Sequence, residues 1–148
     1  MENSITLMDA YMIETIRSNG ISDNELLTQL ELKDLSFLEK LKSNFDFNEL
    51  LKLYEQDSYS FKSILTDGYT VKFITMKGLQ NLLKMKFDKI NERDYQLVDN
   101  GISYLTIEIS VYPTLKQMLS KNWGILDLSE QDSDSSQANR RISILLVK

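Results

Sequence analysis

The residue types that most often carry out chemistry are missing from this chain of 148 residues, which has no histidine and no cysteine. Histidine is the commonest metal ligand and the side chain whose ordinary pKa lies nearest to neutrality. The two absences remove zinc sites and the Ser-His and Cys-His pairs of nucleophilic catalysis. No GxxxxGK[ST] or GxGxxG string is present to hold phosphates. We therefore expect no enzyme, no cofactor and no metal site, and keep a carboxylate- and Mg²⁺-dependent enzyme as a third hypothesis.

Side chains suited to noncovalent recognition alternate along one predicted strand. Tyr104, Thr106 and Glu108 occupy every second position, and apolar residues fill the positions between them. A strand turns successive side chains to opposite faces. If the apolar residues face the core, the other three form a face that suits a moderately polar protein partner. Tyr69, beside another predicted strand, joins them as a protein-binding candidate.

Six basic residues are candidates for contact with DNA phosphates. A winged-helix pattern can be drawn twice, as GLQNLLKMKF before YQLVDNGISYL and as TLKQMLSKNW before GILDL, a polar loop and NRRISILLV. The second segment, of about 35 residues, resembles the recognition helix and wing of MarR/SarA-type regulators. The lysines also fit the solvated side of a helix that covers a sheet. The candidates for DNA binding are Lys77, Lys84, Lys86, Lys89, Arg140 and Arg141.

The composition favours a globular protein rather than a membrane-embedded or disordered one. Apolar residues make up 42% and charged residues 26% of the chain, close to the globular average. No apolar run approaches the ~20 residues that a membrane span needs. The N-terminal segment MENSITLMDAYM lacks the basic start and apolar block of a secretory signal. We expect a single domain over residues 1–148, with a cytoplasmic location.

The negative charge is concentrated in the first half. Residues 1–74 hold 7 Lys and Arg against 13 Asp and Glu, whereas residues 75–148 hold 10 against 9. Such asymmetry indicates either an acidic surface that faces a basic partner or an ordinary solvated surface. Both interpretations stay open at this point.

The first part of the chain, residues 1–58, has helical spacing. Apolar residues predict a helix over residues 4–18 that stops at Asn19-Gly20. Ser22 and Glu25 form a capping box, in which each side chain satisfies the other residue's amide at the start of a helix. Further helices are expected from about Asp34 and from about Phe47. These elements predict an acidic helical layer.

The second part, residues 59–148, alternates predicted hairpins with predicted helices. Two-residue turns are predicted at Asp67-Gly68 and Asn100-Gly101. Helices are expected to start at Thr75 and Pro113, and the second of them to end at Gly124. A mobile loop is expected over residues 129–139, followed by a central strand from Ile142 to Val147. We predict an α+β fold, in which the helical layer is followed by an antiparallel sheet of hairpins in the order ββα-ββα-ββ.

Two functions are favoured over the third hypothesis of a Mg²⁺-dependent enzyme. The first is a non-catalytic protein-binding module with an inhibitor, immunity-type, chaperone or adaptor role, acting through the acidic helices or an exposed sheet face. Its partner is expected to be a protein with a basic patch. The alternative is a winged-helix DNA-binding transcriptional regulator.

Overall fold

The computed structural model describes residues 3–41, 45–128 and 139–147 and has an α+β fold. The helices are α1 (Leu7–Ser18), α2 (Asp23–Glu31), α3 (Ser36–Glu39), α4 (Asn48–Gln56), α5 (Ser58–Asp67), α6 (Met76–Phe87) and α7 (Tyr112–Met118). The strands are β1 (Ser4–Ile5), β2 (Thr70–Val71), β3 (Gln96–Val98), β4 (Gly101–Glu108), β5 (Trp123–Asp127) and β6 (Asn139–Leu146). Among the described residues, no helix has the length and apolar character needed to cross a membrane.

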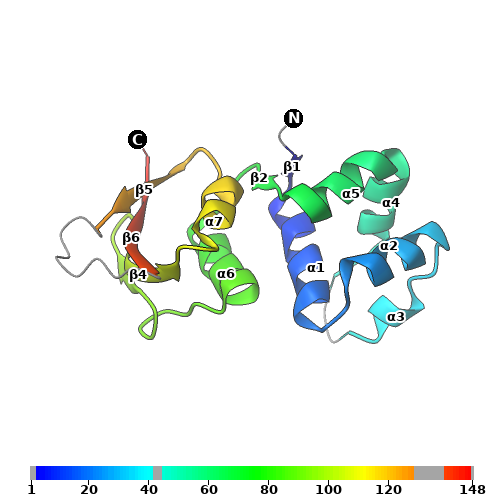
Figure 1. The fold of residues 1–148 in the computed structure, drawn as a ribbon, viewed down its shortest axis with the longest axis horizontal. Coiled ribbons are helices and arrows are strands. Elements are labelled where there is room, and N and C mark those ends of the chain that lie inside the picture. Colours follow the sequence, from blue (N-terminus) through cyan, green and yellow to red (C-terminus); the bar gives the residue numbers. More distant parts are fainter. Residues whose placement is uncertain (1–2, 42–44, 129–138, 148) are drawn as a thin grey trace.

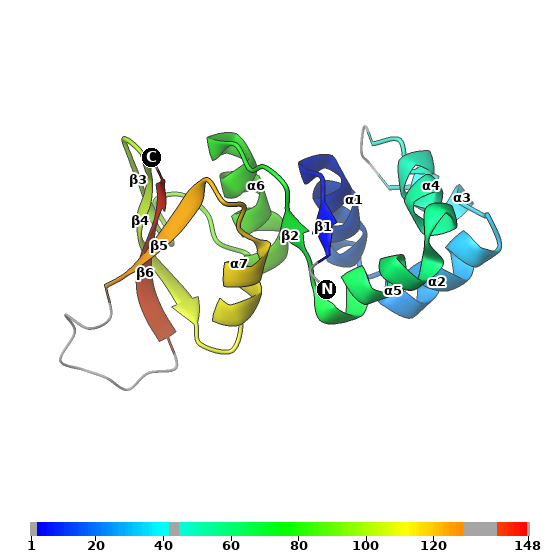
Figure 2. The ribbon, with the colours of Figure 1, turned by 90° about the horizontal axis from the view of Figure 1, so that it is seen from above.

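The helices and the sheet form layers that are stacked along the longest axis of the molecule (Figures 1 and 2). The sheet of β3, β4, β6 and β5 forms one end, and α6 and α7 cover its inner face. Next along the axis come α1 and the small parallel pair of β1 and β2. Helices α2 to α5 form the other end. The sheet and the acidic helices therefore lie at opposite ends of the molecule.

The helix predicted over residues 4–18 begins later than expected, because Ser4 and Ile5 form β1 and Thr6 caps α1 at Leu7. The start of α2 is as the sequence predicts. Ser22 caps α2, because its hydroxyl accepts a hydrogen bond from the amide of Glu25 at 3.1 Å. Helix α1 ends at Asn19, and Gly20 follows with a φ of +82°. The helix expected from Asp34 is the short α3, and Asp34 accepts a hydrogen bond from the amide of Ser36.

The hairpin predicted at Asp67-Gly68 is wrong. Residues 58–67 form helix α5, capped by the side chain of Asp57 on the amide of Ser60. The buried residues of α5 are spaced three and one apart, as on one side of a helix: Phe61, Ile64 and Leu65. Gly68 ends the helix with a φ of +93°, and β2 pairs in parallel with β1. The helical part thus extends beyond residue 58, and the predicted ββα order lacks its first hairpin.

The sheet is antiparallel throughout and has the strand order β3-β4-β6-β5. Strand β6 is central, as its apolar sequence predicts. The hairpin at Asn100-Gly101 forms with its loop one residue earlier than expected, since Val98 pairs with Gly101. Gly101 has a φ of +154°, and a Cβ there would lie 2.1 Å from the carbonyl oxygen of Ile144. The close approach of β6 therefore requires glycine at this position.

The two helices on the sheet start where the sequence predicts and end differently. Thr75 caps α6 by accepting a hydrogen bond from the amide of Gly78, and Pro113 lies in the first turn of α7. Gly124 does not end a helix, because α7 stops at Met118 and Gly124 belongs to β5. Residues 129–138 of the predicted mobile loop lie outside the described residues, and Asn139 begins β6.

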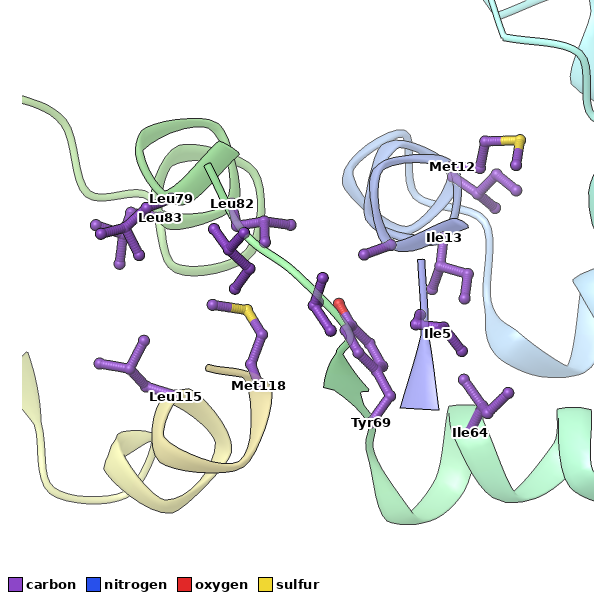
Figure 3. Packing of buried hydrophobic residues seen from close by; sticks show 14 of the residues in the cluster. Ile5, Met12, Ile13, Ile64, Tyr69, Leu79, Leu82, Leu83, Leu115 and Met118 are labelled. Carbon is purple, nitrogen blue, oxygen red and sulfur yellow. The ribbon is translucent and has the colours of Figure 1, made fainter. Parts of the chain in front are cut away.

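The buried apolar side chains form one cluster that runs through the layers. Figure 3 shows Tyr69 between Leu82 and Met118 on the sheet side and Ile5 and Ile13 on the helical side. Each fully buried leucine or isoleucine contributes roughly 1.5–3 kcal/mol of transfer free energy. The shared core therefore couples the helical half to the sheet.

Candidate protein-binding face

The register of the strands assigns each residue to one face of the sheet, because residues directly opposite one another share a face. Leu105 is opposite Ile142, and both are buried beneath α6 and α7. The other face, called the outer face below, is on the side away from these helices (Figure 2). Its residues include Val98 in β3, Ser103, Tyr104, Thr106 and Glu108 in β4, Arg141, Ser143 and Leu145 in β6, and Gly124 and Leu126 in β5.

The predicted alternation in β4 is confirmed, with one departure at its end. Leu105 and Ile107 are buried, and Tyr104, Thr106 and Glu108 are exposed. Ile109 continues the alternation in the sequence, but it follows the end of β4 and is exposed.

A β-bulge turns Tyr104 outwards. The register of β4 against β6 shifts between Ile102 and Leu105, and Tyr104 within this interval has a φ of +59°. A residue other than glycine in the left-handed region carries strain of order 1–3 kcal/mol, and such strain is concentrated at functional sites. The bulge leaves the tyrosine side chain 56% exposed. The strained backbone therefore lowers the stability of the fold at the position that exposes a tyrosine side chain on the outer face.

A hollow of about 330 Å³ lies beside Tyr104 on this face. Its polar part includes the hydroxyls of Ser103 and Ser143, which lie 2.8 Å apart. An apolar wall and a few hydrogen-bonding groups are the usual composition of a protein interface. The residues that line the hollow are Ser103, Tyr104, Leu126, Leu128, Arg141, Ser143 and Leu145.

Tyr69 does not belong to the outer face. It is 2% exposed, lies in the core between the two halves, and donates a hydrogen bond of 2.6 Å to Glu14 Oε2. The assignment of Tyr69 as a protein-binding residue fails because the residues predicted to form a strand before it form a helix, which brings its side chain inside.

The six candidates for DNA contact do not form one basic surface. Lys77 and Lys84 are exposed on α6. Three others bind carboxylates: Lys86 Nζ to Glu14 Oε2 at 2.8 Å, Lys89 Nζ to Glu108 Oε1 at 3.2 Å, and Arg140 NH1 to Asp127 Oδ2 at 2.7 Å. Arg140 also lies over the ring of Tyr112 on the side of α7, whereas Arg141 lines the hollow on the outer face.

A buried charged cluster joins the two halves, and sequence reasoning did not identify it. Glu14 in α1 is 3% exposed, and its Oε2 atom accepts from Tyr69, from Lys86 in α6 and from Arg17 NH1 at 3.1 Å. Arg17 also binds Asp23 through two nitrogens. Glu14 lies among the buried apolar residues of α1, next to Ile13. An acidic residue on the apolar side of a helix was therefore the sequence signal that could have indicated a buried ion pair.

The cluster shifts the pKa of two of its members. Burial lowers the pKa of Lys86, although the charge of Glu14 opposes this effect. Burial also raises the pKa of Tyr69 far above its ordinary value, and the negative charge of Glu14 adds to the increase. A second hollow of about 380 Å³ adjoins the cluster beside Val111 and Thr114. Its charged groups are already paired, so the cluster is well suited to fixing α1 against α6.

The described residues contain no group of three or more His, Cys, Asp or Glu side chains that could hold a metal ion. Comparison of the chain with protein-family models, curated proteins and solved structures found no match.

Proposed function

We propose that this protein is a non-catalytic binding module whose outer sheet face docks a partner protein. The observation that carries the proposal is the strained, exposed Tyr104 beside a hollow on the face that α6 and α7 leave open. Tyrosine is enriched among the residues that dominate interface energies, and such residues lie in well-packed pockets that exclude water. Ser103 and Thr106 supply hydroxyl groups near it, and the hydroxyl of Ser103 is held by that of the buried Ser143.

The acidic helices have a separate role in this proposal. Their exposed carboxylates include Glu25 and Glu31 in α2 and Glu39 in α3, at the end of the molecule opposite the sheet. Charges at that distance do not contact a partner on the outer face. They accelerate the approach of a basic partner through the long-range field, and salt screens this effect. The association rate should therefore fall as ionic strength rises, whereas the dissociation rate should change little.

DNA binding is the weaker alternative. Phosphate contact requires cations that are available to neutralise phosphates. Lys86 and Lys89 already neutralise Glu14 and Glu108. We also propose the cytoplasm as the compartment, because a chain without cysteine needs no oxidising environment.

Site-specific photocrosslinking in the organism that encodes the chain tests the proposal. A benzophenone amino acid replaces Tyr104 in one variant and Tyr59 in α5 in the other, because Tyr59 is an exposed tyrosine remote from the sheet. We expect a discrete crosslinked protein from position 104 that is absent from position 59. The Leu126→Asp substitution, which places a charge in the hollow, should abolish this crosslink. Equal products from positions 104 and 59, or persistence of the product in the Leu126→Asp background, would overturn the proposal.

A further inference from the structure

The second hollow, called the cluster hollow below, is lined by residues in and next to α1, α6 and α7. Its volume of about 380 Å³ is within the range of roughly 300–1,000 Å³ that is usual for small-molecule sites. Met85, Phe87 and Val111 give it an apolar lining, and three members of the buried charged cluster also line it. Charged side chains with a shifted pKa, as Lys86 has, occur often at functional sites. These properties make the cluster hollow a candidate ligand site.

The ion pairs of the cluster leave two donors unused. An ammonium group can donate three hydrogen bonds and a guanidinium group five. Within the described part of the chain, Lys86 donates two, to Glu14 Oε2 at 2.8 Å and to the Tyr69 hydroxyl at 3.5 Å. Arg17 donates four, and its remaining N–H group is on NH1, the nitrogen that binds Glu14 Oε2. Because Lys86 and Arg17 NH1 contact the same oxygen, the two unused donors lie near one another.

Glu14 provides an unused acceptor in the same cluster. Its Oε2 atom accepts hydrogen bonds from three side chains, whereas no group among the described residues donates to its Oε1 atom. Glu14 is 3% exposed, so Oε1 has little contact with bulk water. A buried acceptor without a partner is unfavourable, and such atoms in native proteins usually bond to water or to another molecule. A ligand in the cluster hollow can therefore meet two donors and one acceptor.

The balance of charge in the cluster favours an uncharged ligand. Two carboxylates, those of Glu14 and Asp23, balance the two cations, Arg17 and Lys86. An anion would lie next to Glu14 without a counterion, and a cation would lie next to Lys86. Burial of such an unpaired charge is unfavourable. An uncharged group that has a donor beside an acceptor satisfies the cluster without adding charge.

We infer that the cluster hollow binds a small uncharged ligand with a carboxamide head group and an apolar body. The carbonyl oxygen of the carboxamide has two lone pairs, and it accepts from Lys86 and Arg17. The amide nitrogen donates to Glu14 Oε1. The apolar body packs against Met85 and Phe87. The inference does not rest on the proposed function, because no residue of the outer face lines the cluster hollow.

Three benzene derivatives test the head group. Benzamide, benzoate and benzylamine share one ring, and at neutral pH their head groups are uncharged, anionic and cationic. Their affinities are measured by NMR titration of the isotope-labelled protein, through the backbone amide signals of Lys86 and Thr114, which both line the hollow. Benzamide should give saturable shifts with a Kd in roughly the millimolar range, as expected for so small a ligand. Benzoate and benzylamine should bind at least about tenfold more weakly, because each adds an unpaired charge and leaves a polar atom of the cluster without a partner.

Two results of this titration would overturn the inference. The first is the absence of saturable shifts with benzamide. The second is binding of benzoate or benzylamine as tight as that of benzamide, because the head group would then not be recognised as an uncharged donor and acceptor.

A pair of phenylalanine variants tests the location of the site. Thr114 is exposed in α7 and lines the cluster hollow, so Thr114→Phe should fill the hollow without altering the charged cluster. The shift of the Lys86 amide signal with benzamide should then disappear. Thr66→Phe is the matched control, because Thr66 is exposed in α5 and does not line this hollow; benzamide should bind it as it binds the wild type. Circular dichroism confirms that each variant is folded. Equal affinities of the two folded variants for benzamide would overturn the inference.

Discussion

Replacing Glu14 by glutamine should destabilise the protein far more than the same change at the surface. The glutamine keeps the shape of the side chain but removes the charge that balances Lys86, which is only 12% exposed. Arg17 retains Asp23 and the carbonyl of Leu65 as partners, so Lys86 is the main cation left without a counterion. Breaking a buried ion pair costs about 3–5 kcal/mol. We expect about 3 kcal/mol, at the lower end, since Lys86 retains some contact with water.

Chemical and thermal denaturation measure this loss. For a chain of this size, 3 kcal/mol corresponds to a fall in Tm of about 6–12 °C. Glu49→Gln is the matched control, because Glu49 binds Lys52 at 3.1 Å on an exposed surface of α4. Its Tm should equal that of the wild type. The double variant Glu14→Gln/Lys86→Met should recover part of the loss by removing the orphaned charge. Equal effects of Glu14→Gln and Glu49→Gln would refute the structural role of the cluster.

Three further changes follow from the structure. Burial, and then the charge of Glu14, raise the pKa of Tyr69, so this tyrosine ionises first in the unfolded state, and the free energy of unfolding should fall as the pH rises above 10.0, the ordinary pKa of tyrosine. In urea titrations, the free energy of unfolding of Tyr69→Phe should fall less steeply with pH. Gly101→Ala should cost about 3 kcal/mol in the same assay, because its Cβ meets a carbonyl oxygen of β6, whereas Gly20→Ala, with no atom within 4 Å, should cost about 1 kcal/mol. Tyr104→Asn should leave the Tm unchanged or raised, since asparagine tolerates the left-handed conformation, and should remove the photocrosslinked partner from pull-downs.

Local signals in the sequence were sufficient for much of the fold. Ser22 and Thr75 start helices because their hydroxyls accept amide hydrogen bonds three residues later, a relationship that is visible in the sequence. The alternation around Leu105 predicted which face of β4 is buried. The apolar sequence of β6 predicted a central strand. In each case the pattern and its structural cause lie within a few residues.

The failures come from competition between patterns and from contacts remote in sequence. The Asp67-Gly68 pair is typical of a hairpin, but Gly68 ends α5 instead, because Asp57 caps a helix that buries Phe61. Tyr69 then follows the end of a helix rather than a hairpin turn, and its side chain is buried. Glu14 meets Lys86 across 72 residues, and a local pattern carries no information about such a pair. The bulge at Tyr104 is also invisible, since it depends on how β6 pairs with β4.

The affinity of the photocrosslinked partner for two single alanine variants tests the central claim most directly. Calorimetry with Tyr104→Ala should give a Kd at least about tenfold weaker than that of the wild type, which is the effect of a residue worth about 1.4 kcal/mol in the interface. Tyr59→Ala, at an exposed tyrosine on α5, should bind as the wild type does. An unchanged Kd for Tyr104→Ala, or equal losses for the two variants, would contradict binding through the outer face of the sheet.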